Sequence, residues 1–70
     1  MPSLRDIRQE QAVRAFCRLG GEPRKGKGSH MVVNLNGFNL SIPAGVLKVG
    51  LLKHLIKLSG ITEEEFVEHL

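Results

Sequence analysis

The chain contains one cysteine, few aromatic residues and no long apolar run, and each scarcity excludes a class of protein. The single Cys17 excludes an internal disulfide and is typical of a reducing compartment. Three Phe, without Trp or Tyr, are too few for a large platform on which nucleic-acid bases could stack. No apolar stretch approaches the ~20 residues that cross a bilayer, and no signal peptide precedes the first helical segment. We therefore expect a cytoplasmic protein without membrane contact.

Positive charge is spread unevenly along the chain. Residues 1–62 hold all ten Lys and Arg but only three acids, a net charge of +7, whereas the last eight residues hold four acids. A basic body suggests a polyanionic partner, nucleic acid first, although a solvated basic surface explains the charge equally well. The 70 residues allow one small domain, residues 1–70. Its core is modest, because so short a chain buries only about 60% of its unfolded surface.

Apolar residues at helical spacing predict two main helices. The first covers residues 8–19 and ends at Gly20-Gly21, and the second begins at Gly50 and ends at Ser59-Gly60. A capping box over residues 62–65 predicts a short third helix. The expected apolar side of the second helix consists of Leu51, Leu52, Leu55, Ile56 and Leu58.

Residues 30–42 predict a β-hairpin, because Asn36-Gly37 tolerates the positive φ angles of a two-residue turn. Folding about this turn places six apolar residues on one face: Met31, Val33, Leu35, Phe38, Leu40 and Ile42. A short edge strand over residues 22–24, which tolerates its proline, adds a third strand. The expected fold is therefore α+β, with two layers in the order α-β-β-β-α. Its three-stranded antiparallel sheet carries both main helices on one face.

The opposite, mostly polar face of the hairpin begins with His30, directly after a cationic glycine-rich loop. Histidine is the side chain suited to proton transfer near neutral pH, so His30 is the candidate catalytic residue. Five preceding residues are candidates to hold RNA phosphates: Arg24, Lys25, Lys27, Gly28 and Ser29. The alternatives are a histidine that only hydrogen-bonds backbone and a loop that is only solvated. The other histidines and Cys17 lack metal-ligand spacing, so we expect no metal and no cofactor.

Four segments, in their order and spacing, resemble the HicA-type mRNA interferase toxins of toxin–antitoxin pairs. They are Leu19-Gly20, Lys27-Gly28-Ser29-His30, Ile42-Pro43, and Gly50-Leu51-Leu52 leading to the segment over residues 59–66. The resemblance covers about residues 9–70 and implies a fold like the double-stranded-RNA-binding domain. It also implies metal-independent RNA cleavage with His30 as the catalytic histidine, and a HicB-like antitoxin as protein partner.

Three functions stay open at this point. The first is a metal-independent endoribonuclease that cleaves single-stranded mRNA, in which His30 takes the proton of a ribose 2′-hydroxyl and Lys27 or water protonates the leaving oxygen. The second is a non-catalytic RNA-binding module. It is kept open by Ala44-Gly45 and Met31, which stand where relatives carry further histidines. The third is a protein-interaction domain that uses the polar sheet face.

Overall fold

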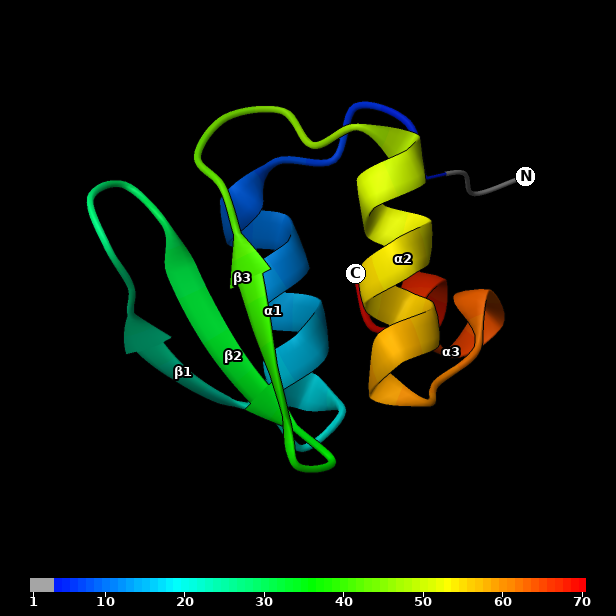
Figure 1. Cartoon of the computed structure of the whole chain (residues 1–70). Helices are drawn as coiled ribbons and strands as arrows, with labels where there is room; N and C mark the ends of the chain where they lie inside the picture. The colour runs from blue at the N-terminus through cyan, green and yellow to red at the C-terminus, as the bar shows by residue number, and fades with distance from the viewer. Residues whose placement is uncertain (1–3) are drawn as a thin grey trace.

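The computed structural model describes residues 4–70 and contains three helices and three strands (Figure 1). They follow one another as α1 (Gln9–Arg18), β1 (Glu22–Lys25), β2 (Met31–Leu35), β3 (Phe38–Ile42), α2 (Val49–Ser59) and α3 (Glu63–Glu68). The strands form one antiparallel sheet in the order β1-β2-β3. This confirms the α+β class and the predicted order α-β-β-β-α, to which α3 is added as the short third helix.

The register of the hairpin is the one that the sequence predicts. Val33 lies opposite Leu40, and Leu35 opposite Phe38. The turn between them uses the left-handed region, with φ 53° at Asn36 and 85° at Gly37. β1 pairs with β2 and forms the edge of the sheet, so its proline, Pro23, removes no bond from a central strand.

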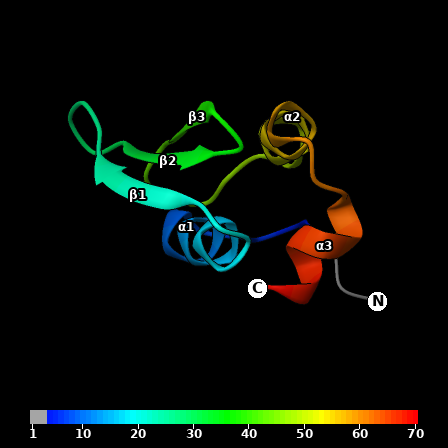
Figure 2. The ribbon, with the colours of Figure 1, turned by 90° about the horizontal axis from the view of Figure 1, so that it is seen from below.

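α1 covers the apolar side of the sheet, and the other two helices pack around it and the edge strand β3 (Figure 2). α1 lies beneath β2, α2 runs alongside β3, and α3 contacts both helices (Figures 1 and 2). Within the core, the rings of Phe16 and Phe66 lie 4.9 Å apart at a tilt of 50°, which joins α1 to α3. The fully or nearly fully buried apolar residues are Leu4, Ile7, Ala12, Ala15, Phe16, Val33, Leu35, Leu40, Ile42, Leu47, Leu52, Leu55, Ile56 and Phe66.

Two apolar residues expected on the buried side are exposed instead. Phe38 is 46% exposed because it follows the hairpin turn at the end of the sheet, and Leu58 is 39% exposed because it lies on the flank of α2. Leu70, the last residue, is 38% exposed. Met31 is only half-buried, at the start of β2. α2 begins at Val49, one residue before the predicted start.

The segment before α1 is part of the core, which the sequence did not predict. Leu4 and Ile7 are buried, and the Ile7 carbonyl accepts a hydrogen bond of 2.8 Å from the backbone N–H of Leu47. Arg8 forms an isolated antiparallel bridge with Val46. The N-terminal segment thus packs against the connection between β3 and α2 and pairs with it. No helix within residues 4–70 is long and apolar enough to cross a membrane.

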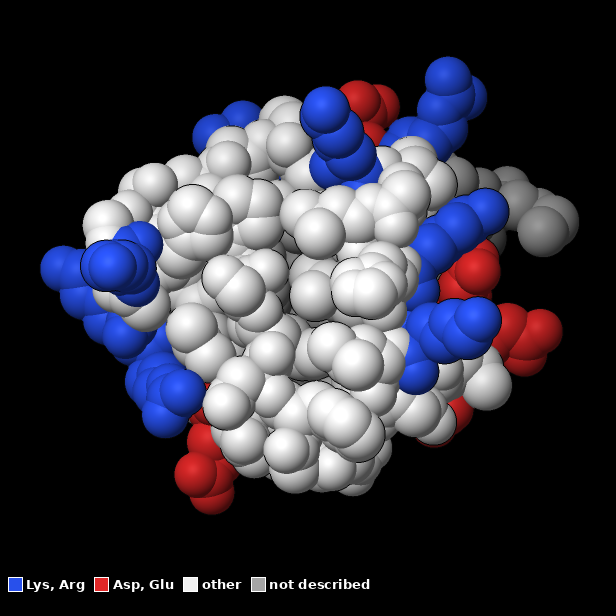
Figure 3. Space-filling view, in the orientation of Figure 1, with Lys and Arg blue, Asp and Glu red and all other residues white. Residues whose placement is uncertain are grey.

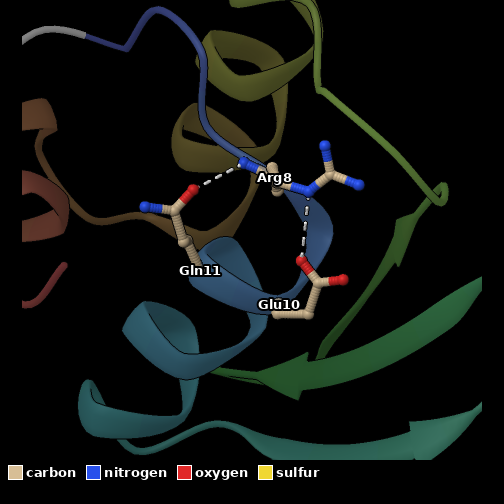
Figure 4. Close-up of polar contacts among 3 residues, drawn as sticks. All are labelled: Arg8, Glu10 and Gln11. Carbon is tan, nitrogen blue, oxygen red and sulfur yellow. Dashed lines mark hydrogen bonds and ion pairs between the residues drawn. The ribbon is translucent and has the colours of Figure 1, made fainter.

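The first turn of α1 is stabilised by its own side chains (Figure 4). The backbone N–H of Arg8 donates to Gln11 Oε1 at 2.9 Å, which satisfies one of the N–H groups at the helix start. Arg8 Nε lies 3.7 Å from Glu10 Oε2, an exposed ion pair of small energetic value. Gln9, the next residue, is held by its own backbone N–H, which donates to the carbonyl of Gly45 at 3.0 Å.

Candidate active site on the uncovered sheet face

Strand pairing decides which candidate residues share a face, because directly opposed residues of antiparallel strands point the same way. Arg24, Val32 and Ser41 are opposed across the three strands, and this row lies on the face without helices. Lys25 is opposed to Met31, on the helix-covered side. His30 precedes Met31 and therefore shares the uncovered face with Arg24. The structure thus brings Arg24 to the side of His30 and directs Lys25 to the other side.

The loop between β1 and β2 holds the backbone of His30 at both of its polar groups. The His30 carbonyl accepts from the N–H of Gly26 at 2.9 Å, and the His30 N–H donates to the carbonyl of Lys27 at 3.1 Å. Gly28 turns the chain with φ +62°, which a glycine adopts without strain. A Cβ at Gly26 would lie 2.9 Å from Val32 Cγ2, so glycine also fits the close approach there. The cationic glycine-rich segment is therefore a tight, internally bonded turn.

A shallow depression, open to solvent, lies at this end of the uncovered face. Its lining consists of Lys27, Gly28, Ser29, His30 and Ser41. The side chains of Lys27, His30 and Ser41 are exposed. Among residues 4–70, no group hydrogen-bonds the His30 imidazole. The imidazole is thus accessible to a bound molecule, while its backbone is fixed.

The charge around the depression is positive on one side and neutral on the other. Lys and Arg side chains gather over the β1–β2 hairpin at the left of Figure 3, where Arg24, Lys25 and Lys27 are exposed. The centre of this view is uncharged. On the uncovered face, Asn34 Nδ2 donates to Asn39 Oδ1 at 3.0 Å, across the pair of β2 and β3. Acidic side chains lie beside the cations along α2, at the right, and also below the cationic group at the left.

The remaining titratable candidates lie away from the depression. His54 is exposed on α2, and His69 is half-buried, with Nδ1 2.7 Å from the carbonyl oxygen of Glu65. Burial raises the pKa of the Cys17 thiol, which lowers its thiolate fraction and makes it a poor nucleophile. Within the described residues 4–70, no three His, Cys, Asp or Glu side chains gather as a metal site.

Two residues to which the sequence assigned no role belong to the site. Ser41 lines the depression from β3. Gln9, the first residue of α1, donates from Nε2 to the carbonyl oxygens of Ser29 at 2.8 Å and Ile42 at 2.9 Å. The sequence gives no local signal for either role, because Ser41 and Gln9 each lie far along the chain from the loop that contains His30. Comparisons with protein-family models, curated proteins and solved structures found no match to this chain.

Proposed function

We propose that the protein is a metal-independent endoribonuclease of the HicA type that cleaves single-stranded mRNA at the depression around His30. The observation that carries the proposal is the combination of a fixed backbone and a free, exposed imidazole at the edge of a cationic hairpin. Acid–base catalysis needs such rigid placement of a side chain that remains accessible to its substrate. The uncovered sheet face gives an RNA strand access to the site.

In the proposed reaction, the neutral imidazole of His30 takes the proton of a ribose 2′-hydroxyl. The 2′-oxygen then attacks the adjacent phosphorus, and the bond from phosphorus to the 5′-oxygen breaks. Lys27 or water supplies the proton that the departing 5′-oxygen needs. The products are a 2′,3′-cyclic phosphate and a 5′-hydroxyl, so all the chemistry is proton transfer and phosphoryl transfer within the RNA.

The other residues of the depression bind and stabilise the phosphate. Arg24 shares the uncovered face with His30, and Lys27 lies at the rim of the depression, so both cations serve the negative charge that grows in the transition state. The hydroxyls of Ser29 and Ser41 line the same depression and are donors for the non-bridging oxygens. Gly28 presents backbone to the phosphate without a side chain in the way.

The substrate itself tests this chemistry. A ribo-oligonucleotide in excess EDTA is expected to yield fragments that end in a 2′,3′-cyclic phosphate, identified by mass spectrometry. The same sequence with 2′-deoxyribose throughout keeps every phosphate but loses the nucleophile, so it is expected to remain intact. Cleavage of the deoxy strand, or cleavage of the ribo strand that EDTA abolishes, would contradict the proposal.

The proposed enzyme class also implies where the protein acts and which partners it binds. The proposed substrate, mRNA, places the protein in the cytoplasm, and the proposed protein partner is a HicB-like antitoxin that covers the depression. A protein that binds RNA with salt-dependent affinity but releases no fragments would instead be a non-catalytic RNA-binding module. Among the residues that the structure describes, His30 is the one histidine in the lining of the depression, and this observation favours the second candidate.

A further inference from the structure

Gln9 joins the two segments that form the depression. One segment is the β1–β2 loop, which contributes residues 27–30 to the lining. The other is β3, which contributes Ser41. The Gln9 carboxamide donates to the carbonyl oxygen of Ser29 in the first segment and to that of Ile42 in the second, at 2.8 and 2.9 Å. A carboxamide nitrogen has two hydrogens, so both are used.

The position of Gln9 makes it suited to this role. Its own backbone N–H donates to the carbonyl of Gly45 at 3.0 Å, so the start of α1 is attached to the connection after β3. The Ser29 carbonyl belongs to the peptide unit that leads directly into His30. Gln9 therefore acts on the backbone next to the catalytic side chain, while the contacts of Gly26 and Lys27 act from the loop itself.

We propose that Gln9 is a positioning residue that holds the backbone of His30 in the geometry required for RNA cleavage, an inference that rests on the proposed function. It does not touch the substrate. Without it, the loop keeps the bonds within residues 26–30 but loses the two hydrogen bonds through which Gln9 connects Ser29 to α1 and to Ile42 of β3. A displacement of about 1 Å at a catalytic group is sufficient to cost ~10²-fold in rate.

Gln9→Glu separates positioning from general stability. The carboxylate has no hydrogen to donate to either carbonyl oxygen, so both contacts are lost. A negative charge in the first turn of a helix is otherwise favourable, so the helix is not weakened. We expect kcat for RNA cleavage to fall about 10–10²-fold, with KM changed less than about threefold and a loss in Tm somewhat larger than that of a variant that loses one hydrogen bond. Gln9→Met, which keeps the length without charge, is expected to lower kcat in the same way.

Gln11→Ala is the matched control. Gln11 is a glutamine of the same helix turn, and its Oε1 accepts from the backbone N–H of Arg8 at 2.9 Å, away from the depression (Figure 4). Its removal deletes a hydrogen bond between side chain and backbone without touching the His30 loop. We expect a small loss in Tm and an unchanged kcat.

Amide hydrogen exchange provides a readout that needs no RNA. In the Gln9 variants, the amides of Gly26 and His30, which close the loop, are expected to exchange faster than in the wild type and in Gln11→Ala. Unchanged exchange at both amides, or faster exchange with unchanged kcat, would overturn the positioning role. If the wild type does not cleave RNA, the proposed function fails, and the exchange data alone decide whether Gln9 holds the loop.

Discussion

Gly26→Ala tests the geometry of the candidate site through protein stability. A Cβ at this position would lie 2.9 Å from Val32 Cγ2 and 3.1 Å from the His30 carbonyl oxygen, closer than such atoms normally approach. Relief of the contact with the His30 carbonyl oxygen, a backbone atom, requires the loop to move by a few tenths of an ångström, which weakens the 2.9 Å hydrogen bond from Gly26 to His30. Overpacking of this kind costs about 1–3 kcal/mol. That is a large share of the total stability of a 70-residue domain, about 4–10 kcal/mol.

Gly50→Ala is the control, because it is expected to raise the stability that Gly26→Ala lowers. Gly50 lies within α2, and no heavy atom comes within 4 Å of the added Cβ. Alanine in a helix is favoured over glycine by about 0.5–1 kcal/mol, so this variant is expected to gain stability.

Thermal unfolding followed by circular dichroism measures both variants. In a domain of this size, each kcal/mol shifts Tm by about 4–8 °C. We expect a clear loss in Tm for Gly26→Ala and a small gain for Gly50→Ala. Equal Tm values for Gly26→Ala and the wild type would refute the close packing of the loop on His30.

Three further predictions concern binding, the core and the free thiol. Lys27→Ala is expected to reduce the slope of log Kd for single-stranded RNA against log salt by about one. Lys25→Ala, on the other face, is expected to change this slope less. A larger change for Lys25→Ala than for Lys27→Ala would contradict the assignment of faces. Phe66→Ala removes a fully buried ring that packs on Phe16 and is expected to cost about 3–5 kcal/mol in denaturant unfolding, so a loss below 1 kcal/mol would be inconsistent with that packing. Because burial raises its pKa, Cys17 is expected to react with iodoacetamide at pH 8 more slowly in the folded than in the urea-unfolded chain; equal rates would contradict this.

Local signals in the sequence predicted most of the fold. Asn36-Gly37 fixed the hairpin and its register, because only a two-residue turn pairs Leu35 with Phe38. Thr62 and Glu65 form the predicted capping box, with their two reciprocal hydrogen bonds at 3.0 and 3.1 Å. These features depend on neighbours within a few residues, which a sequence displays directly. The exposure of His30 also followed from the alternation along β2.

What the sequence could not predict depends on contacts between distant segments. The side on which Lys25 lies is set by the register of β1, which the hydrogen bonds of the loop between Gly26 and His30 determine. The contacts of Gln9 join residues 20 and 33 positions away, so no spacing rule indicates them. The burial of Leu4 depends likewise on the closure of the N-terminal segment against residues 45–47. The residues of the candidate site were therefore named more completely than the contacts that hold them in place.

The central claim is that His30 performs acid–base chemistry on RNA. The most direct test compares the wild type, His30→Ala and His54→Ala in single-turnover cleavage of a ribo-oligonucleotide in EDTA. His54 is an exposed histidine on α2 that lies outside the depression, so its variant controls for the loss of an imidazole elsewhere.

We expect His54→Ala to cleave like the wild type, and His30→Ala to bind RNA and keep its fold but lose about 10²–10⁴ in rate. Cleavage by His30→Ala at the wild-type rate would contradict the account.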